Sequence, residues 1–242
     1  ISIVFTWHVG IFLWKLLKNT CTKSIFIYKI CIFLTNHFFF AFTINKIPFD
    51  FTSSGYSLCI VDTGGNHADL TDDYASVPAE MKSVAAEFGK SFLRDTDAET
   101  VKANIPALRE KLGDRAILRA LHFFAENKRV ASQKAALLGG DLDAFFSEVL
   151  ASGKSSFCYL QNVYTSKNLS EQGLSLALCL AEKYLSDKSG AWRVHGGGFA
   201  GTIQAYVAAK DVEGFRAIMD GVFGEGKCIV LRIRPEGAVR VL

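Results

Sequence analysis

Paired cysteines and an excess of basic charge are both missing from this 242-residue sequence, and its first 49 residues contain no acidic side chain. The six cysteines form no C-x-x-C pair, which argues against zinc and disulfide frameworks and favours reduced cytosolic thiols. Residues 51–242 hold 22 Lys and Arg against 23 Asp and Glu, so they lack the basic field that nucleic-acid binding requires. We therefore expect a cytoplasmic protein with no nucleic-acid partner.

Residues 1–47 differ from the rest of the chain. They are rich in Phe and Ile, and their apolar residues follow neither a helical nor a strand period. The longest apolar run, residues 24–44, contains Lys29, and a charge in the middle of a spanning helix costs about 2.5–3.5 kcal/mol. Three interpretations stay open: AT-rich DNA translated out of frame, which we favour, a membrane anchor, or an unusual soluble extension. We treat 1–47 as a separate segment and expect no membrane partner.

Residues 48–242 have the patterns of a globular domain. A β-rich run at 56–63 ends at Gly64-Gly65 and predicts a buried strand. Further strands are predicted at 192–195, 202–208 and 227–233, and helices at 114–138, 142–151, 170–185 and 212–223. Because the strands gather near the end instead of alternating with helices, the order predicts an α+β layer.

Several residues are expected to delimit or orient these helices. Apolar residues at helical spacing from Tyr74 to Phe88 predict a helix with Ser76 as N-cap and Gly89 as its end. Thr96-x-x-Glu99 is a capping-box pattern, and Gly139-Gly140 closes the long helix. The residues of the long helix expected to face inward are Ile117, Leu121, Phe124, Ala131 and Ala135.

Glycines at 196, 198 and 201 fit G-x-G-x-x-G, the pattern of a dinucleotide-binding loop. Such a loop needs a helix after it, because the pyrophosphate binds at that helix's N-terminus. Residues 202–207 instead alternate β-branched and aromatic side chains, which indicates a strand. We therefore reject a nicotinamide or flavin site and predict a loop between two strands. Its glycines serve either a tight turn without a ligand or the close approach of another group.

Three other patterns are weak signals of chemistry. The stretch "SGKSS" at 152–156 has Glu148 where a Walker A loop needs glycine. His122 and Glu126 lie one helical turn apart, and we favour a solvated i,i+4 interaction over a metal pair. His67, Asp69 and Asp72-Asp73 follow a strand end, as residues of a site or of a solvated turn. We predict no metal-binding residue.

Three separated stretches together resemble the galactokinases of the GHMP family of small-molecule kinases. They are "CIVDTGGNHADLTDDYASVPAEM" at 59–81, "RALHFFAENKRV" at 119–130 and "WRVHGGGFAGTIQAYV" at 192–207, the last being similar to the family's third motif. The resemblance covers about residues 48–242, and these residues are similar to the C-terminal half of a galactokinase. It implies a GHMP-kinase-like layer of antiparallel strands with packed helices. The activity it implies is transfer of the γ-phosphate of Mg-ATP to the anomeric hydroxyl of galactose, giving galactose 1-phosphate.

The resemblance also implies which residues approach the ligands. Tyr74 corresponds to a tyrosine that contacts the sugar, and an aromatic ring with a hydroxyl suits a sugar. The loop near the nucleotide phosphates would contain Gly196, Gly197, Gly198 and Gly201. Glycines there allow backbone N–H groups to approach a phosphate that side chains would block. ATP, Mg²⁺ and galactose are thus the implied ligands.

Other galactokinase elements have no counterpart in this sequence. These are a sugar-binding R-x-N-x-x-G-E-H-x-D-Y motif, a Gly/Ser-rich phosphate loop and a segment that supplies the catalytic Asp. Residues 152–164, "SGKSSFCYLQNVY", also depart from the S-H-x-S-L-R-D-D-Y-like stretch of many members. We therefore expect no catalytic residue here, no turnover by this chain alone, and low solubility from an open apolar face. A non-catalytic sugar or nucleotide sensor and a membrane-tethered binding module are the alternatives.

Overall fold

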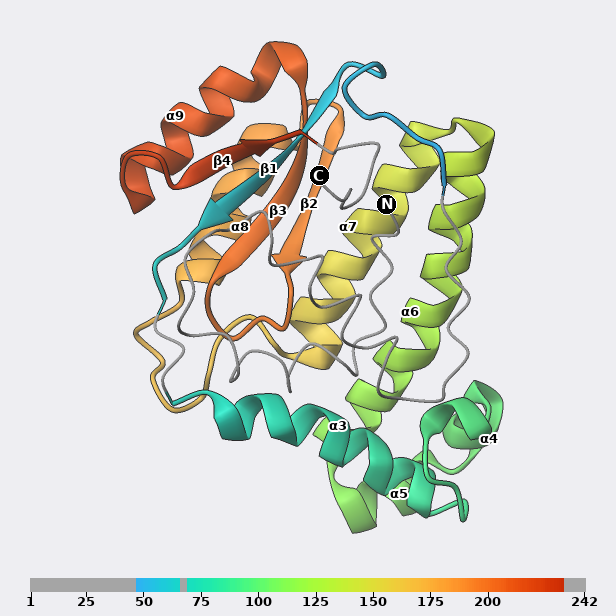
Figure 1. The fold of residues 1–242 in the computed structure, drawn as a ribbon. Helices are drawn as coiled ribbons and strands as arrows, with labels where there is room; N and C mark the ends of the chain where they lie inside the picture. Colours follow the sequence, from blue (N-terminus) through green and yellow to red (C-terminus); the bar gives the residue numbers. More distant parts are fainter. Residues whose placement is uncertain (1–46, 66–68, 233–242) are drawn as a thin grey trace, which may run out of the picture.

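The computed structural model describes residues 47–65 and 69–232, in which four strands form one antiparallel sheet with helices on both faces (Figure 1). The strands are β1 (Tyr56–Asp62), β2 (Gly190–His195), β3 (Thr202–Ala208) and β4 (Cys228–Leu231). Their order in the sheet is β2-β3-β1-β4, so the first strand of the chain lies between the two that come last. The predicted α+β layer and each of its strands are confirmed.

One face of the sheet packs against α8 (Gly173–Leu185) and α9 (Val212–Phe223). Strand residues that alternate along β1 and β3 point to this face, because side chains of a strand have a period of two. Cys59 and Val61 are buried there, while the other residues of β1 are half-buried. The prediction of a buried strand is therefore confirmed for one face only.

The other face of the sheet is covered by α7 (Leu142–Ser155), which lies against β2 and is followed by the π-helix η3 (Ser156–Leu160). The approach is close at Gly153, where an added Cβ would lie 3.0 Å from the Trp192 carbonyl oxygen. Phe145 and Phe146 of α7 pack with Tyr206 of β3 and with Phe51 from the segment before β1. The segment before β1, helix α7 and strand β3 thus contribute to one aromatic cluster.

The long helix α6 (Asp114–Gly139) packs on α7 and ends at Gly140 in the left-handed conformation, as predicted. Ile117 is buried, and Leu121 and Phe124 are partly buried, in agreement with their expected inward orientation. Ala131 and Ala135 are exposed, so that part of the prediction is wrong. In the second half of α6, Ala136 is buried and Leu137 partly buried in the aromatic cluster with α7.

The lower layer in Figure 1 contains α3 (Thr71–Ala86), α4 (Ala98–Ala103) and α5 (Ile105–Leu112), with the short 3₁₀ turn η2 (Leu93–Asp95) between them. A second 3₁₀ turn, η4 (Ala209–Asp211), precedes α9. The core of this layer lies between α3, α5 and α6 and is separate from the two clusters on the sheet.

Two predicted caps in this layer are wrong. Helix α3 begins at Thr71, so Ser76 lies inside it, where its hydroxyl donates to the Asp73 carbonyl at 2.7 Å. The cap of α4 is Asp97, whose carboxylate accepts from the Thr100 N–H, instead of Thr96. Gly89 does follow the end of α3, with φ +67°, as predicted.

None of the helices in the described part of the chain is long and apolar enough to cross a membrane. Residues 1–46, to which the membrane-anchor alternative refers, lie outside the described residues, as does His67 of the predicted polar cluster.

Candidate functional site

The glycine loop, residues 196–201, joins β2 to β3 at the end of the sheet that faces α3 (Figure 1). It is a connection between two strands, as predicted. Gly196, Gly198 and Gly201 have positive φ angles of 76°, 79° and 99°. Phe199 also has φ +60°, a conformation that costs a residue with a Cβ about 1–2 kcal/mol. Its buried ring packs edge-on against Tyr74, with ring centroids 5.4 Å apart, and anchors it there.

Tyr74 of α3 closes one side of the glycine loop. A Cβ on Gly197 would lie 2.8 Å from the Tyr74 ring, so glycine is needed for this approach. The Tyr74 hydroxyl donates to the Gly198 carbonyl at 2.8 Å. Burial, with a smaller contribution from Asp73, raises the pKa of Tyr74 to about 12, so the hydroxyl keeps its proton at neutral pH. Two of the predicted contacts with ligands, Tyr74 and the glycines, are therefore direct neighbours.

Asn162 closes the other side of the glycine loop. Its side-chain amide donates to the Gly197 carbonyl at 3.1 Å, and its backbone carbonyl accepts from the Phe199 N–H at 2.5 Å. A Cβ on Gly198 would overlap that backbone carbonyl. The sequence does not single out Asn162, although this residue lies in 152–164, the stretch that departs from the galactokinase pattern.

The end of β1 completes the surroundings of the loop. Thr63 donates to the Gly201 carbonyl through both its N–H, at 2.9 Å, and its hydroxyl, at 2.8 Å. Gly65 approaches Ala200 so closely that an added Cβ would lie 2.9 Å from the alanine Cβ. The structure therefore brings Tyr74, Gly197 and Gly198 together and holds Gly201 against Thr63, while Gly196 lies at the edge of the loop with open space around it.

The predicted acidic cluster lies at the start of α3, beside Tyr74. Lys167 makes ion pairs with Asp72 at 3.0 Å and with Asp73 at 3.9 Å. The Thr165 hydroxyl donates to Asp73 at 3.0 Å, and Lys167 also donates to the Asp69 carbonyl. The three acidic residues are thus linked to a loop far along the chain. Within the described residues, no group of three or more His, Cys, Asp or Glu side chains could hold a metal ion.

His122 and Glu126 are not on a solvated face, so the predicted solvated interaction is wrong. His122 is 5 % exposed and shares a hydrogen bond of 2.9 Å with the Ser155 hydroxyl. Burial lowers the pKa of His122 to about 4, which leaves the imidazole neutral at pH 7. The cause is tertiary, because α7 covers this face of α6.

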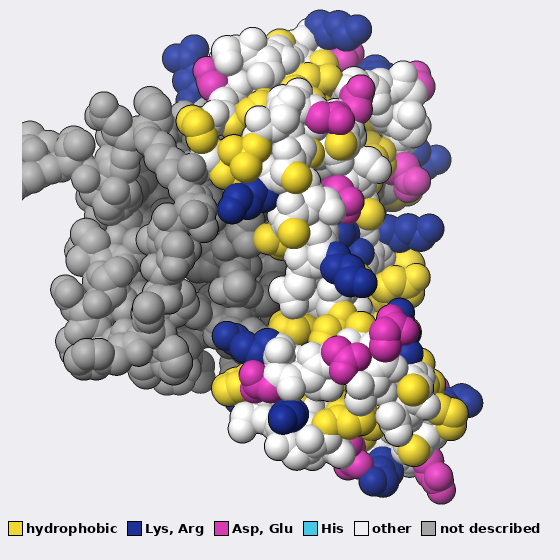
Figure 2. Space-filling model, turned by 90° about the vertical axis from the view of Figure 1, so that its right-hand side faces the viewer, with side chains coloured by type: hydrophobic (Ala, Val, Ile, Leu, Met, Phe, Trp, Pro, Cys, Tyr) yellow, Lys and Arg dark blue, Asp and Glu magenta, His cyan; other side chains and the backbone are white. Residues whose placement is uncertain are grey.

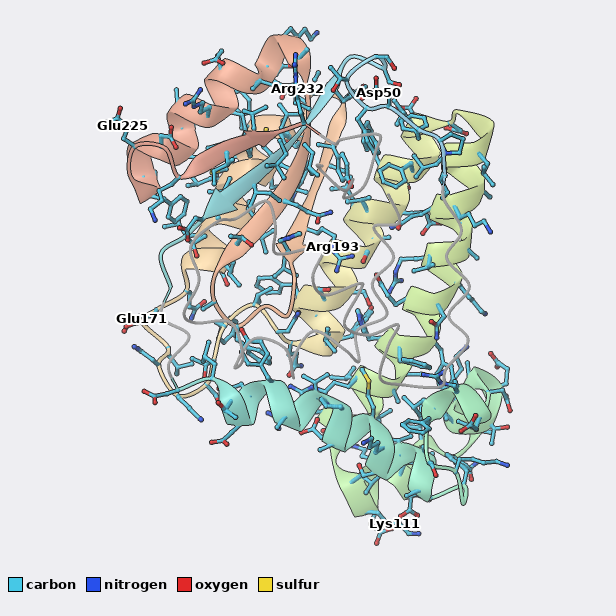
Figure 3. The ribbon with its side chains drawn as sticks, in the orientation of Figure 1. Asp50, Lys111, Glu171, Arg193, Glu225 and Arg232 are labelled. Atoms are coloured by element: carbon cyan, nitrogen blue, oxygen red, sulfur yellow. The ribbon has the colours of Figure 1, made fainter. Side chains whose placement is uncertain are left out.

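Glu126 is the centre of a half-buried polar network between α6, α7 and β2. It pairs with Arg129 at 2.8 Å and with Arg193 at 3.4 Å, and it accepts a hydrogen bond from the Ser152 hydroxyl. Burial raises the pKa of Glu126, but Arg193, Ser152 and smaller effects outweigh it and lower the pKa overall. Arg193 lies between the sheet and α7 (Figure 3), where it also donates to Ser152 at 2.6 Å. This network fixes β2 close to the start of the glycine loop.

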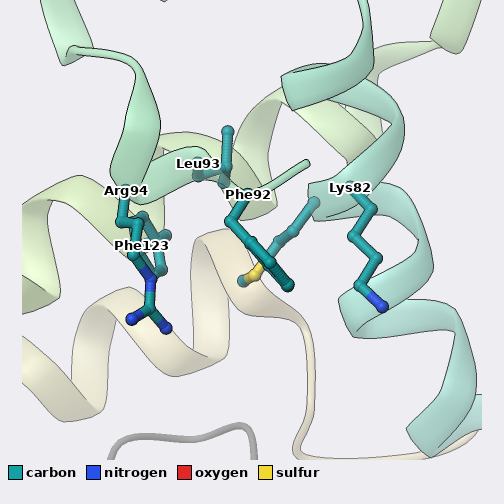
Figure 4. Close-up of a pocket in the computed structure, with 6 residues that line it drawn as sticks. Lys82, Phe92, Leu93, Arg94 and Phe123 are labelled. Atoms are coloured by element: carbon teal, nitrogen blue, oxygen red, sulfur yellow. The ribbon is translucent and has the colours of Figure 1, made fainter. Parts of the chain in front are cut away.

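A small cavity lies two helical turns along α3 from Tyr74 (Figure 4). Its volume is about 10 Å³, and Lys82 and Arg94 flank the ring of Phe92 at its mouth. This is enough space for about one water molecule and far too little for a sugar or a nucleotide. On the face of Figure 2, acidic and basic side chains are mixed, without a continuous basic area among the coloured residues.

Comparisons with known proteins point to one kind of enzyme. No family model matches the chain. The chain is 32% identical over 180 residues to a galactokinase of Streptomyces coelicolor, covering 74% of this chain and 43% of that protein. A galactokinase of Actinobacillus pleuropneumoniae is 28% identical over 165 residues, covering 68% and 41%. The chain thus spans about two fifths of the length of the curated relatives it matches.

Among solved structures, galactokinase from Lactococcus lactis in complex with galactose is similar, with a TM-score of 0.57 and 23% identity. The match covers 74% of this chain and 45% of that one. The fold is therefore similar to part of that structure, a mixed layer of helices and antiparallel strands. In sequence, the chain is a homologue of galactokinases over about 70% of its length, which confirms the resemblance.

Proposed function

We propose that this chain provides the glycine-loop part of a galactokinase-like sugar kinase, which phosphorylates galactose with ATP. The observation that carries this proposal is the contact of Tyr74 with Gly197 and Gly198. The resemblance assigns Tyr74 to the sugar and the loop to the phosphates. Because the two are in van der Waals contact, a hexose beside one and a phosphate beside the other would be within reach of each other.

The residues present fit a polyphosphate better than a bare metal ion. The side chains that crowd Gly197 and Gly198 are the uncharged Tyr74 and Asn162, so we propose that a phosphate would meet backbone N–H groups of the loop instead of charged side chains. The described residues contain no cluster of metal ligands, so we propose that Mg²⁺ reaches the site bound to ATP. When bound, Mg²⁺ neutralises phosphate charge, while this chain's contribution is to position the ligands.

We also propose that the chain does not turn over by itself. Phosphoryl transfer needs groups that stabilise the developing charge as well as groups that position the reactants. The side chains described above that hold the glycine loop by hydrogen bonds, Thr63, Tyr74 and Asn162, are all uncharged. They can orient the backbone, but none can act as a general base or balance the charge of a transferred phosphoryl group.

The test combines turnover and binding with the full chain. In a coupled assay of ADP release with galactose and Mg-ATP, we expect no rate above background. In NMR titrations with galactose and with a nonhydrolysable ATP analogue, we expect weak, saturable shifts that Tyr74→Phe reduces for galactose. Tyr159→Phe, at an exposed tyrosine, is the matched control, and glucose is the matched sugar.

The outcomes separate the parts of this proposal. A galactose-dependent rate well above background would contradict the proposed inactivity. If neither ligand shifted any resonance at millimolar concentration, the sugar-kinase proposal itself would fail. Saturable binding without turnover is also what a non-catalytic sensor would give, so the glucose comparison measures whether galactose is the sugar recognised.

Location and domain organisation remain proposals as well. Cys59 and Cys228 are free and buried in the core between the sheet and its helices, which supports a reducing compartment such as the cytoplasm. We keep the division into a segment 1–47 and a galactokinase-like domain 48–242. Expression of residues 48–242 alone tests it, since a domain of this kind should unfold in one cooperative transition.

A further inference from the structure

We propose that Asn162 and Tyr74 are positioning residues that fix the direction of the peptide groups in the glycine loop. In this arrangement the Gly198 N–H is the donor that meets a phosphate oxygen, and the Phe199 N–H is not. This inference rests on the proposed role of the loop in binding phosphate. It assigns that role to one peptide group and names the side chains that set its orientation.

The first step concerns the peptide group between Gly197 and Gly198. In a trans peptide the carbonyl and the N–H point in opposite directions, and the described residues contain no cis peptide. The Gly197 carbonyl accepts from the Asn162 side-chain amide at 3.1 Å. The Gly198 N–H therefore points away from Asn162. Gly198 is buried, and within the described part of the chain its N–H is a donor without a hydrogen-bond partner.

In the next peptide group, between Gly198 and Phe199, both the carbonyl and the N–H already make hydrogen bonds within the protein. Its carbonyl accepts from the Tyr74 hydroxyl at 2.8 Å, and its N–H donates to the Asn162 backbone carbonyl at 2.5 Å. A ligand could take the Phe199 N–H only by breaking the latter bond. Two adjacent donors that look equivalent in sequence are thus distinguished by their partners.

The burial and hydrogen bonding of Asn162 indicate that its side chain serves to position the glycine loop. The residue is 1 % exposed, and its side-chain oxygen is buried without a hydrogen-bond partner in the described residues. An unpaired buried acceptor costs about 1–3 kcal/mol, so an amide chosen for stability alone would be paired at both ends. The side-chain hydrogen bond that Asn162 does make within the described residues is its donation to Gly197.

Backbone strain gathers on both sides of the same contact. In the described residues, positive φ at a non-glycine occurs at Gln161, with 57°, and at Phe199, with 60°. Gln161 follows η3 and turns the chain so that Asn162 faces the loop. Phe199 donates its backbone N–H to the Asn162 carbonyl. Such conformations persist where the surroundings enforce them, and they gather at ligand sites. The two strained residues therefore lie at the contact between Asn162 and the glycine loop. We call the hydrogen bonds of Asn162 and Tyr74 to this loop the clamp.

The test uses the full chain labelled with ¹⁵N and titrated with inorganic tripolyphosphate. We expect the Gly198 amide to shift most and the Phe199 amide to shift little. Asn162→Ala removes the donor to Gly197 without adding charge, and it should weaken binding at least about tenfold. Tyr74→Phe removes the donor to Gly198 and keeps the ring, so it tests the clamp even if Asn162→Ala fails to fold. Asn127→Ala, at an exposed asparagine of α6, is the matched control.

Three outcomes are distinguishable. If no loop amide of the unmodified chain shifts, the proposed phosphate role of the loop fails, and this assignment with it. If loop amides shift with equal affinity in the unmodified chain and in each folded variant, the loop binds phosphate but the positioning role is overturned. A largest shift at Phe199 would overturn the choice of Gly198. Unfolding midpoints measured in parallel separate lost binding from lost stability, since a purely structural residue would change the midpoint alone.

Discussion

Two glycine pairs in this chain look alike in sequence and differ in what they require. Gly139-Gly140 ends α6, and an added Cβ on either residue would meet nothing within 4 Å. Gly197-Gly198 lies in the glycine loop, where an added Cβ would meet the Tyr74 ring at 2.8 Å or overlap the Asn162 carbonyl. In the first pair, Gly140 is needed for backbone conformation, because it has φ +70°, whereas nothing in the structure requires glycine at 139. The second pair is needed mainly for space.

The largest effect is expected for Gly198→Ala. The new Cβ would overlap a backbone oxygen, which cannot rotate away, and the residue also has φ +79°. We expect the free energy of unfolding to fall by about 3–5 kcal/mol, from overpacking and backbone strain together. Chemical denaturation followed by circular dichroism measures it. A loss under 1 kcal/mol would mean that the loop is not held as described.

Gly197→Ala should have an intermediate effect. Here the obstacle is the ring of Tyr74, a side chain that can move, and the residue does not have positive φ. We expect a loss of about 1–3 kcal/mol. In a Tyr74→Ala background the same change should cost much less, because the clash is gone, and a double-mutant cycle measures that coupling. Strict additivity of the two changes would contradict the contact.

Gly140→Ala should cost about 1–2 kcal/mol, which is the price of a left-handed conformation for a residue with a Cβ. No clash adds to it, since the surrounding space is open. The measurement is again the denaturation midpoint, with Gly140→Asn as a control that tolerates this conformation better than alanine. If alanine and asparagine were equally destabilising, the requirement would not be one of backbone conformation.

The smallest effect is expected for Gly139→Ala, and it has the opposite sign. Gly139 is the last residue of α6, has ordinary helical surroundings and has open space beside it. Alanine should stabilise the protein by about 0.5–1 kcal/mol, through helix propensity and a less flexible unfolded chain. A lower melting temperature for this variant would show that the end of α6 has contacts that an added Cβ disturbs.

Elements that depend on local pattern were predictable from the sequence. Strand β3 and helix α9 have the predicted ranges, because alternating or helical apolar spacing and flanking glycines define them. Cap positions were less predictable. Asp97 caps α4 instead of Thr96, since both are good capping residues and they are adjacent in the sequence. Ala131 and Ala135 were assigned inward because a helical period does not say how far along a helix its neighbour extends.

The site was predictable where one residue type was unusual, and not where a tertiary contact decides. Tyr74 lies against Gly197 and Gly198 of the loop, and the ligand contacts that the galactokinase resemblance implies for them stay predictions. Asn162 could not be predicted, because its position depends on the left-handed conformation of Gln161. No glycine or other turn signal at 161 indicates that conformation. His122 and Glu126 were placed in solvent because the segments that bury them, α7 and β2, come later in the chain.

The sheet order has a consequence for how the protein is made. β1 is among the first described segments to be synthesised, yet both of its neighbours, β3 and β4, come from residues 202–208 and 228–231. At about 5–20 residues per second, the nascent β1 waits on the order of ten seconds before either partner leaves the ribosome. During that interval its apolar residues Leu58, Cys59, Ile60 and Val61 are available to chaperones or to another nascent chain. Slower translation after residue 62 would prolong this exposure, and the yield of soluble protein should fall accordingly.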